Sequence, residues 1–318
     1  MLLVVVAACE PPFQLGQPTT RELETGASDL LTAAGSFTLT GTYTDSTGAG
    51  WTISAVFLRP DREDVVVSRP GVKVEALLIG SQAYFRGQAF LAEHMGTDAL
   101  SQTLVKAAGN AWWKGSTEFA PQLPDFTAGP AFRSTFLGSA VTRRTDHVAI
   151  DGAEAIELSG PRADVYIRAA APHDLMRVQT RKDVVIDGLA RPDFEYGNFN
   201  RRGTEITAPS DVIDFSNLTT LPPVYTVVTV DTSRCGSPCV VSAQLKNLGG
   251  LFGATAPSTV AFTMRASVSG TVIGACQVQV TPDVGYNATT SVSCTITLSG
   301  PPENAAVVTA TPTNPGRA

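Results

Sequence analysis

The chain has 318 residues, and because single domains usually hold about 100–200 residues, this length favours two domains. Hydrophobic residues make up 43% of the chain and charged residues only 16%, which argues against a disordered tail protein and a long charged coiled coil. The formal net charge of −6 argues against the basic surface of a nucleic-acid-binding protein, so we expect no nucleic-acid partner.

The first residues have the character of an export signal. Residues 2–8 read Leu-Leu-Val-Val-Val-Ala-Ala, which is shorter than the about 20 residues that span a bilayer but is typical of the end of a signal-peptide core. Val6-Ala7-Ala8-Cys9 resembles the lipobox of bacterial lipoproteins, in which small residues precede an acylated cysteine. We expect residues 1–9 to be the signal remnant, with lipidation at Cys9 and a translation start upstream of Met1. The alternative is a short apolar segment with a chance cysteine.

A proline-rich stretch at residues 10–18 is expected to be an extended tether. An amphipathic helix should follow it. Thr19 and Glu22 fit a capping box, and Gly35 is a natural stop. The apolar positions at helical spacing are Leu23, Ala27, Leu30, Leu31 and Ala34.

After Gly35 the hydrophobic period changes to two, which predicts strands. The expected strands are Ser36–Thr44, the run containing Trp51, Ile53 and Phe57, Val72–Ile79, Ala83–Arg86, His147–Ile150, Ala153–Leu158, Asp164–Arg168 and Leu175–Lys182. Two helices interrupt them, Thr97–Ala108 with a Thr cap and Asp125–Leu137. This order predicts an α+β domain over residues 19–215, a curved antiparallel sheet with helices on one side.

Residues 222–312 read as all-β, after a short proline-containing linker at residues 208–223. The expected strands are Val224–Val230, Cys239–Lys246, Ser258–Val268, Val272–Val280, Thr290–Leu298 and Ala306–Ala310. This number of short strands in about 90 residues predicts an immunoglobulin-like β-sandwich.

Four cysteines remain if Cys9 is lipidated, and all lie in the last third of the chain. Their spacing does not fit zinc knuckles, and an even count in an exported protein favours disulfides over a metal site or free thiols. Four cysteines allow three connectivities. Cys276 and Cys294 are equidistant from Gly285 in a predicted hairpin, so we expect them to pair, and Cys235 to pair with Cys239 across a tight turn.

No catalytic constellation is present in the sequence. The three histidines, His94, His147 and His173, have no metal-ligand spacing, and there is no Gly-x-Ser-x-Gly nucleophile motif. We therefore expect a protein that is not an enzyme, with no metal and no cofactor.

Several segments carry a family resemblance. The lipobox, the opening helix and Gly35–Gly41 entering the sheet are followed by Ile79–Arg86, a strand, turn and aromatic strand, and by Gly109–Gly115 with its pair of tryptophans. The closing segments are Ile156–Gly160, Asp164–Arg168, Leu175–Val178, Asp193–Asn198 and the final Ala208-Pro209. In these features residues 19–215 resemble the LppX/LprG-type lipoproteins of actinobacteria, which share the LolA/LolB-like half-barrel. Residues 222–312 depart from that family and weakly resemble bacterial Ig-like adhesion modules through Leu245-Lys-Asn-Leu-Gly249.

The resemblance implies a non-enzymatic carrier: a half-barrel with helices on its concave side and an apolar cavity for acyl lipids or lipidated glycans. It also implies lipid anchoring through Cys9 at the outer face of the cell membrane. The candidate cavity residues are Phe37, Leu39, Ile53, Phe57, Phe85, Ile156, Leu158, Val165, Ile167, Met176 and Val178. The same residues fit an ordinary packed core equally well.

Two further alternatives stay open. The basic pairs Arg143-Arg144 and Arg201-Arg202 are either head-group contacts or solvated surface. The protein as a whole is either a lipid carrier or an envelope sensor or adhesion lipoprotein, which would contact an envelope protein partner through its Ig-like domain.

The lipobox leads to a direct prediction. Cys9→Ser should release the protein from the membrane into the soluble or secreted fraction. The reason is that two or three acyl chains attached at Cys9 would bind a bilayer far more firmly than a short apolar segment does. Fractionation of cells expressing either form measures this. Unchanged membrane retention of the variant would contradict the lipobox interpretation.

Overall fold

The computed structural model describes residues 17–203, 205–236, 238–298 and 306–317, so the lipobox with Cys9 and most of the expected tether lie outside the described residues. The chain is a mixed α+β protein made mostly of strands, with a large sheet and a nearly closed barrel-like sheet. It folds as two compact units: unit 1 combines residues up to 69 with residues 120–205, and unit 2 combines residues 70–119 with the chain from 206 onward. The expected domain limits of 19–215 and 222–312 stay a prediction beside this division.

Unit 1 opens with the expected amphipathic helix, α1, at Thr20–Ala33. The capping box is present: the Thr19 hydroxyl accepts the backbone N–H of Glu22 at 3.2 Å, and the Glu22 carboxylate accepts the backbone N–H of Thr19 at 2.7 Å. Leu23, Ala27 and Leu31 are fully buried on one side of the helix. The helix therefore begins and packs as its sequence predicts.

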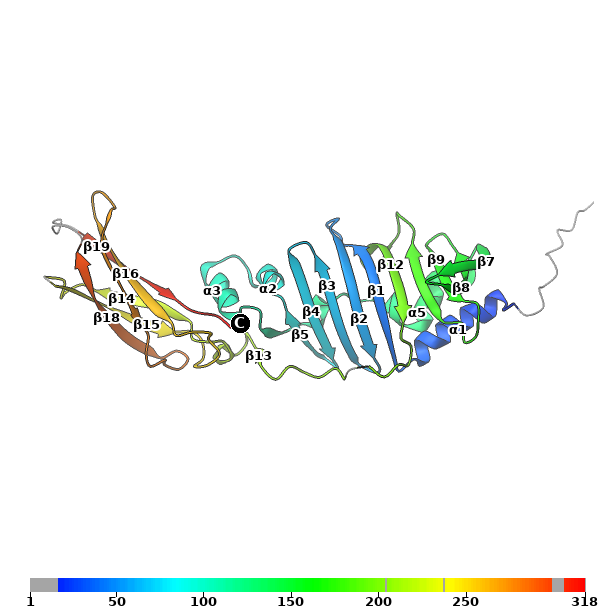
Figure 1. Cartoon of the computed structure of the whole chain (residues 1–318), viewed down its shortest axis with the longest axis horizontal. Helices are drawn as coiled ribbons and strands as arrows, with labels where there is room; N and C mark the ends of the chain where they lie inside the picture. Colours follow the sequence, from blue (N-terminus) through cyan, green and yellow to red (C-terminus); the bar gives the residue numbers. More distant parts are fainter. Residues whose placement is uncertain (1–16, 204, 237, 299–305, 318) are drawn as a thin grey trace, which may run out of the picture. The chain divides into compact units, whose positions relative to one another are not determined.

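The sheet of unit 1 is antiparallel, with the strand order β3-β2-β1-β12-β10-β9-β8-β7 and with β11 paired to β12 (Figure 1). Its strands are β1 (Ser36–Thr44), β2 (Gly50–Leu58), β3 (Arg62–Arg69), β7 (Arg143–Ile150), β8 (Ala153–Ser159), β9 (Ala163–Arg168), β10 (Leu175–Thr180), β11 (Val185–Ile186) and β12 (Leu189–Gly197). The alternating apolar positions predict β1, β2 and β7–β10. Strand β3 was not expected, because three charged residues begin it and only Val65 and Val67 show the alternation of buried positions that is typical of a strand.

Two short helices form instead of the single helix expected over residues 125–137, and the second of them packs on α1. Helix α4 (Pro124–Thr127) ends at Ala128, whose backbone is extended, and α5 (Gly129–Phe136) begins there with Pro130 in its first turn. Proline has no N–H to continue a helix but suits a helix start, which explains the break. A Cβ at Gly129 would collide with the carbonyl oxygen of Ser28 in α1, so α5 approaches α1 closely only because residue 129 is glycine.

Unit 2 begins with β4 (Val72–Ile79), β5 (Gln82–Arg86) and β6 (Trp112–Gly115), and β13 (Val212–Ile213) adds to β6 in parallel. Between them lie α2 (Gln88–Met95), which was not expected, and α3 (Ala99–Ala108). Asp98, not Thr97, caps α3, because its carboxylate accepts the backbone N–H groups of Leu100 and Ser101 at 3.0 Å each. Three short 3₁₀ turns occur in the described chain, at Thr117–Phe119, Gly138–Ala140 and Leu218–Thr220.

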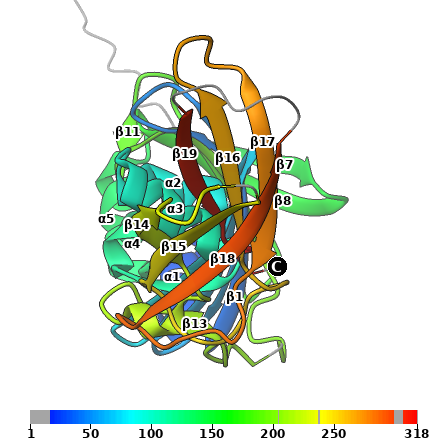
Figure 2. The same cartoon turned by 90° about the vertical axis from the view of Figure 1, so that its left-hand side faces the viewer.

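The remaining strands of unit 2 form one curled six-stranded sheet in the order β14-β15-β18-β17-β16-β19 (Figure 2). They are β14 (Tyr225–Asp231), β15 (Cys239–Asn247), β16 (Thr259–Ala266), β17 (Val272–Gln279), β18 (Thr289–Leu298) and β19 (Ala306–Thr313). All six match expected strands, since every one alternates apolar and polar residues.

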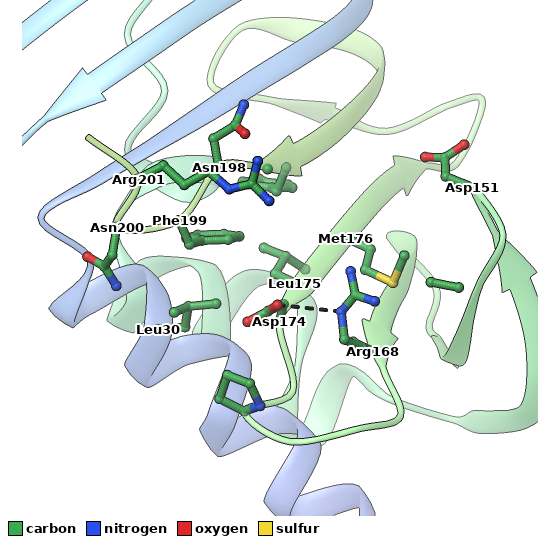
Figure 3. A pocket seen from close by; sticks show the side chains of 14 residues that line it. Leu30, Asp151, Arg168, Asp174, Leu175, Met176, Asn198, Phe199, Asn200 and Arg201 are labelled. Carbon is green, nitrogen blue, oxygen red and sulfur yellow. Dashed lines mark ion pairs between the residues drawn. The ribbon is translucent and has the colours of Figure 1, made fainter. Parts of the chain in front are cut away.

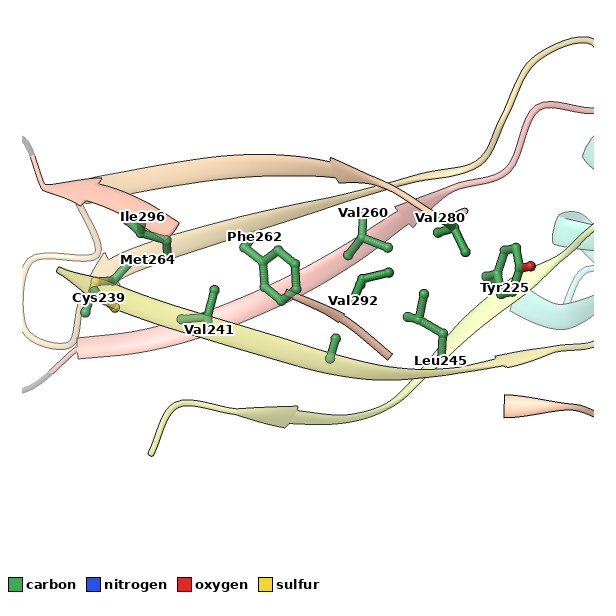
Figure 4. Close-up of a cluster of buried hydrophobic side chains, with 11 residues drawn as sticks. Tyr225, Cys239, Val241, Leu245, Val260, Phe262, Met264, Val280, Val292 and Ile296 are labelled. Atoms are coloured by element: carbon green, nitrogen blue, oxygen red, sulfur yellow. The ribbon is translucent and has the colours of Figure 1, made fainter. Parts of the chain in front are cut away.

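The sheet wraps around a single apolar interior, drawn in Figure 4. Phe262, Val260 and Val241 are fully buried there. At the open edge the Asn314 side chain accepts the backbone N–H of Tyr225 at 2.8 Å and donates to its carbonyl at 3.0 Å, which links the end of β19 to the start of β14. The expected two-sheet Ig-like sandwich is not confirmed, because β17 and β18 hydrogen-bond to each other and join the strands into one nearly closed sheet.

Both expected disulfides are present, Cys276–Cys294 and Cys235–Cys239. The geometry of the Cys276–Cys294 bridge differs from the direct cross-strand pairing that we expected. Gly274 stands opposite Leu298 in the ladder, so the two cysteines do not face each other as direct hairpin partners, and their Cα atoms are 6.2 Å apart. Cys276 lies opposite Phe262 of β16 and Cys294 opposite Val241 of β15. The bridge therefore reinforces the junction where β17 and β18 pair over two residues each.

One buried polar side chain organises the base of this sheet. Asn247 is fully buried, and its side-chain oxygen accepts the backbone N–H groups of Val224 and Gly249 at 2.8 and 2.9 Å. Its amide nitrogen donates to the carbonyls of Gly250 and Val284 at 2.9 and 2.6 Å. All four hydrogen-bonding positions of the side chain are thus used by backbone that would otherwise be buried without partners.

Asn247→Ala should lower the free energy of unfolding by about 3 kcal/mol, because it leaves several buried backbone groups unpaired. Urea denaturation of the full chain measures this. Gln244→Ala, on an exposed position of the same strand, is the control and should change stability by less than about 0.5 kcal/mol. Equal effects of the two substitutions would show that the Asn247 network does not stabilise the fold.

Candidate ligand pocket

Unit 1 contains a pocket of about 440 Å³ beside α1 (Figure 3). Four segments enclose it: α1 through Leu30, the β7–β8 turn, the segment from β9 into β10, and the end of β12 with the loop that follows. The lining residues are Leu30, Asp151, Ala153, Arg168, Pro172, Asp174, Leu175, Met176, Tyr196, Gly197, Asn198, Phe199, Asn200 and Arg201. A volume of this size is within the range of small-molecule sites.

The large apolar side chains of the lining come from α1, β10 and the loop after β12. Leu175 and Met176 begin β10 and are buried, and Leu30 reaches the pocket from α1. Phe199 follows β12, and its ring lies 5.8 Å from that of Phe37 in the core. The pocket wall therefore continues directly into the hydrophobic core of unit 1.

The loop after β12 is fixed in an unusual backbone conformation. Asn198 and Asn200 both have left-handed φ angles, 55° each, a region that asparagine adopts more readily than most residues. The Asn200 side chain accepts the backbone N–H of Gly35 at 2.7 Å, and its own N–H donates to the Ser36 carbonyl at 2.8 Å. The Ser36 hydroxyl donates to the carbonyl of Arg201 at 2.9 Å. These bonds tie the loop to the start of β1.

The opposite wall is the connection between β9 and β10. Arg168 and Asp174 form an ion pair across it, with Nε and Oδ2 3.4 Å apart. His173 has a φ of 63°, and its Nδ1 lies 3.2 Å from the Arg168 carbonyl. A Cβ at Gly26 of α1 would lie 3.0 Å from the His173 Cβ, so the glycine lets this wall rest closely on the helix.

The residues expected to line a cavity are all buried, but they do not all meet at the pocket. Met176 is the candidate that lines it. Phe37 and Phe57 stack on each other with ring centroids 4.7 Å apart and so belong to packed core. Leu39, Ile53, Ile156, Leu158, Val165, Ile167 and Val178 are likewise buried strand residues outside the pocket lining.

Phe85 belongs to unit 2, in an aromatic group separate from the pocket residues. Its ring lies 5.0 Å from Trp113 and 5.8 Å from Phe90. Trp113 is 3% exposed, which fits a packing role for the second residue of the tryptophan pair.

The two basic pairs have different surroundings. Arg143 forms an ion pair with Glu157 at 3.1 Å, and Arg144 pairs with Asp146 at 2.7 Å while donating to the Pro18 carbonyl at 2.9 Å. Arg201 lines the pocket, and Arg202 is exposed outside its lining.

The pocket residues that sequence reasoning missed lie mainly in connections. The signal that points to them is Asn198-Phe199-Asn200 directly after a strand, since two asparagines at alternate positions are typical of left-handed backbone in a turn. Asp-Gly at residues 151–152 is a typical turn sequence, but nothing in the local pattern places it at the same pocket as Phe199.

Within the described residues, no group of three His, Cys, Asp or Glu side chains is placed to hold a metal ion. No helix in the same part of the chain is long and apolar enough to cross a membrane.

Comparison with known proteins gives a weak structural likeness. No protein-family model matches the chain, and no curated protein matches it. Among solved structures, MucB in complex with MucA(peri) is similar over 87% of this chain and 93% of that chain, with 12% sequence identity and a TM-score of 0.30. The resemblance to LppX/LprG-type lipoproteins is not confirmed, and a likeness this weak carries no argument about function.

Tyr196 forms part of the pocket wall and gives a prediction about pH. Its hydroxyl donates to the Phe126 carbonyl at 2.9 Å, and burial, with the negative charge of Asp187, raises the pKa of Tyr196 well above 10. Because the folded pKa exceeds the unfolded value, this tyrosine contributes full stability below pH 10, and the contribution is lost as the pH rises above 10.

Tyr196→Phe should therefore reduce the free energy of unfolding by about 1 kcal/mol at pH 8, and the difference from wild type should shrink as the pH rises above 10. Urea denaturation from pH 8 to 11 measures both effects. Tyr43 and Tyr225, whose pKa values burial raises to about 12, are unchanged in both proteins and do not affect the difference. A gap that stays constant with pH would contradict the argument.

Proposed function

We propose that this protein is a non-enzymatic lipid-binding lipoprotein of the cell envelope and that the unit 1 pocket holds an acyl chain. The observation that carries the proposal is the make-up of the pocket. Leu30, Leu175, Met176 and Phe199 supply apolar wall, while charged and amide side chains line other parts of the same pocket. An amphiphile needs this combination, because its chain must leave water while its head group stays solvated.

The energetics favour a single acyl chain as occupant. Each buried CH₂ contributes about 0.8 kcal/mol, so even half of a palmitoyl chain supplies about 6 kcal/mol before ordering costs. A pocket of about 440 Å³ has room for such a length, and the stacked Phe37 and Phe57 rings lie outside its lining.

The sequence supports the cellular setting. The lipobox at Cys9 predicts anchoring at the outer face of the membrane, and two disulfides suit an oxidising compartment. A protein held beside a bilayer has access to lipids that leave it. Carrying or holding lipids or lipidated glycans at that surface is the function that joins the pocket to this setting.

A second candidate is contact with an envelope protein through the barrel-like sheet of unit 2. Val272 and Val307 stand on either side of Arg265 across the ladder and are 49% and 56% exposed, and Val268 in the adjoining hairpin is 94% exposed. Apolar side chains gathered on a strand surface favour a protein contact. This role is compatible with lipid binding in unit 1 and would make the protein an envelope sensor or adhesion lipoprotein.

Filling the pocket tests the proposal. Ala153, at the start of β8, lines the pocket, so Ala153→Phe should weaken binding of 11-(dansylamino)undecanoic acid by at least about tenfold, because the ring occupies the space of the chain. The matched control is Ala149→Phe, because Ala149 is exposed on the neighbouring strand β7. This variant should bind the probe as tightly as wild type does. Fluorescence titration of the delipidated full chain measures the affinities.

Three results bear on the outcome. Probe binding by wild type and the control, and not by Ala153→Phe, supports the pocket as the binding site. No binding to wild type overturns the proposal. Equal binding by all three proteins assigns the probe to another surface and rejects this pocket, provided that circular dichroism shows the variants folded.

A further inference from the structure

The charges that line the unit 1 pocket balance, but only half of them are paired. Arg168 and Asp174 neutralise each other in the ion pair of the β9–β10 wall. Arg201 and Asp151 remain, and neither has an ion-pair partner among the residues that the structure describes. Figure 3 shows these two on different walls of the pocket, Arg201 on the loop after β12 and Asp151 at the β7–β8 turn.

Arg201 is presented by backbone that is already fixed. Its N–H donates to the Asn198 carbonyl at 3.1 Å and its carbonyl accepts the Ser36 hydroxyl, so the loop does not have to order when a ligand arrives. Two asparagines with left-handed φ angles precede it in the same loop and set the direction of the chain there. The guanidinium that this fixed backbone presents suits a phosphate group, which it can bind through two N–H groups.

Asp151 is fixed by a different device. It and Gly152 have φ angles of 48° and 76°, both left-handed, which is the conformation of a tight type I′ hairpin turn between β7 and β8. Ile150 and Ala153 are paired directly behind it in the ladder. The carboxylate thus stands at a rigid strand end on the pocket, where it suits a cationic group.

We propose that the pocket selects amphiphiles with a zwitterionic head group, an aminoalkyl phosphodiester whose phosphate lies at Arg201 and whose ammonium lies at Asp151. This inference rests on the proposed lipid binding and names the class of ligand. A purely anionic head group would satisfy Arg201 but would leave Asp151 facing negative charge. A purely cationic one would leave Arg201 uncompensated. The neutral, separated pair therefore favours the zwitterion over either.

Two lysophospholipids with the same palmitoyl chain test this, lysophosphatidylethanolamine and lysophosphatidylglycerol, each titrated below its micelle concentration into the delipidated full chain by calorimetry. Wild type should bind the ethanolamine lipid about fivefold more tightly, a difference typical of one solvent-accessible charge contact. Asp151→Asn should abolish that preference, because the ammonium loses its carboxylate partner and the anionic lipid no longer faces a negative charge. Arg201→Gln should weaken both lipids by about fivefold.

Matched controls come from exposed residues outside the pocket lining, Arg202→Gln and Asp183→Asn, which should keep the wild-type ratio. Equal affinity of wild type for the two lipids, or an unchanged ratio in Asp151→Asn, overturns the head-group inference. If the dansyl probe still binds wild type in that case, the proposed lipid binding is supported although the head-group inference is wrong. If neither lysolipid nor the dansyl probe binds wild type, both proposals fail.

Discussion

The pairing of β12 with β1 is the interaction on which the rest of unit 1 depends. These strands lie far apart in the sequence, yet Leu39 stands opposite Tyr196 and Gly41 opposite Phe194 at the middle of the sheet. The register brings the loop after β12 back to Gly35 and Ser36, where β1 begins. Without this return the loop would lose the backbone groups that fix it, and the pocket would lose the wall that carries Phe199 and Arg201.

Local patterning predicted most of the elements. The Thr19 capping box, the alternation in residues 36–44 and the six strands of the barrel-like sheet are present because each follows from residues close in sequence. The errors arose where a neighbour outside the pattern decided the outcome. Pro130 divides the expected helix, and Asp98 caps α3 in place of Thr97 because a carboxylate accepts two backbone N–H groups there.

The candidate site was less accessible to sequence reasoning. Burial of the strand residues was foreseeable, but whether they line a cavity depends on register and on side-chain packing across the sheet. Phe37 and Phe57 fill space by stacking, whereas Met176, of similar apolar character, borders the pocket. The polar residues of the pocket come from three separate segments, and only long-range strand pairing assembles them. The disulfides illustrate the same limit: hairpin counting identified the partners, while the actual ladder register came from pairing with β15 and β16.

The contact between Arg144 and Pro18 has a mechanical consequence. Arg144 belongs to β7, which ends the strand order of the unit 1 sheet, and its guanidinium holds the carbonyl of the residue just before the capping box. Tension applied to the chain ahead of residue 17 would therefore load this edge strand as well as the first turn of α1. Strand β7 leads directly into the β7–β8 turn that carries Asp151. Force on the chain ahead of residue 17 would therefore act on the Asp151 side of the pocket more directly than on the Arg201 side.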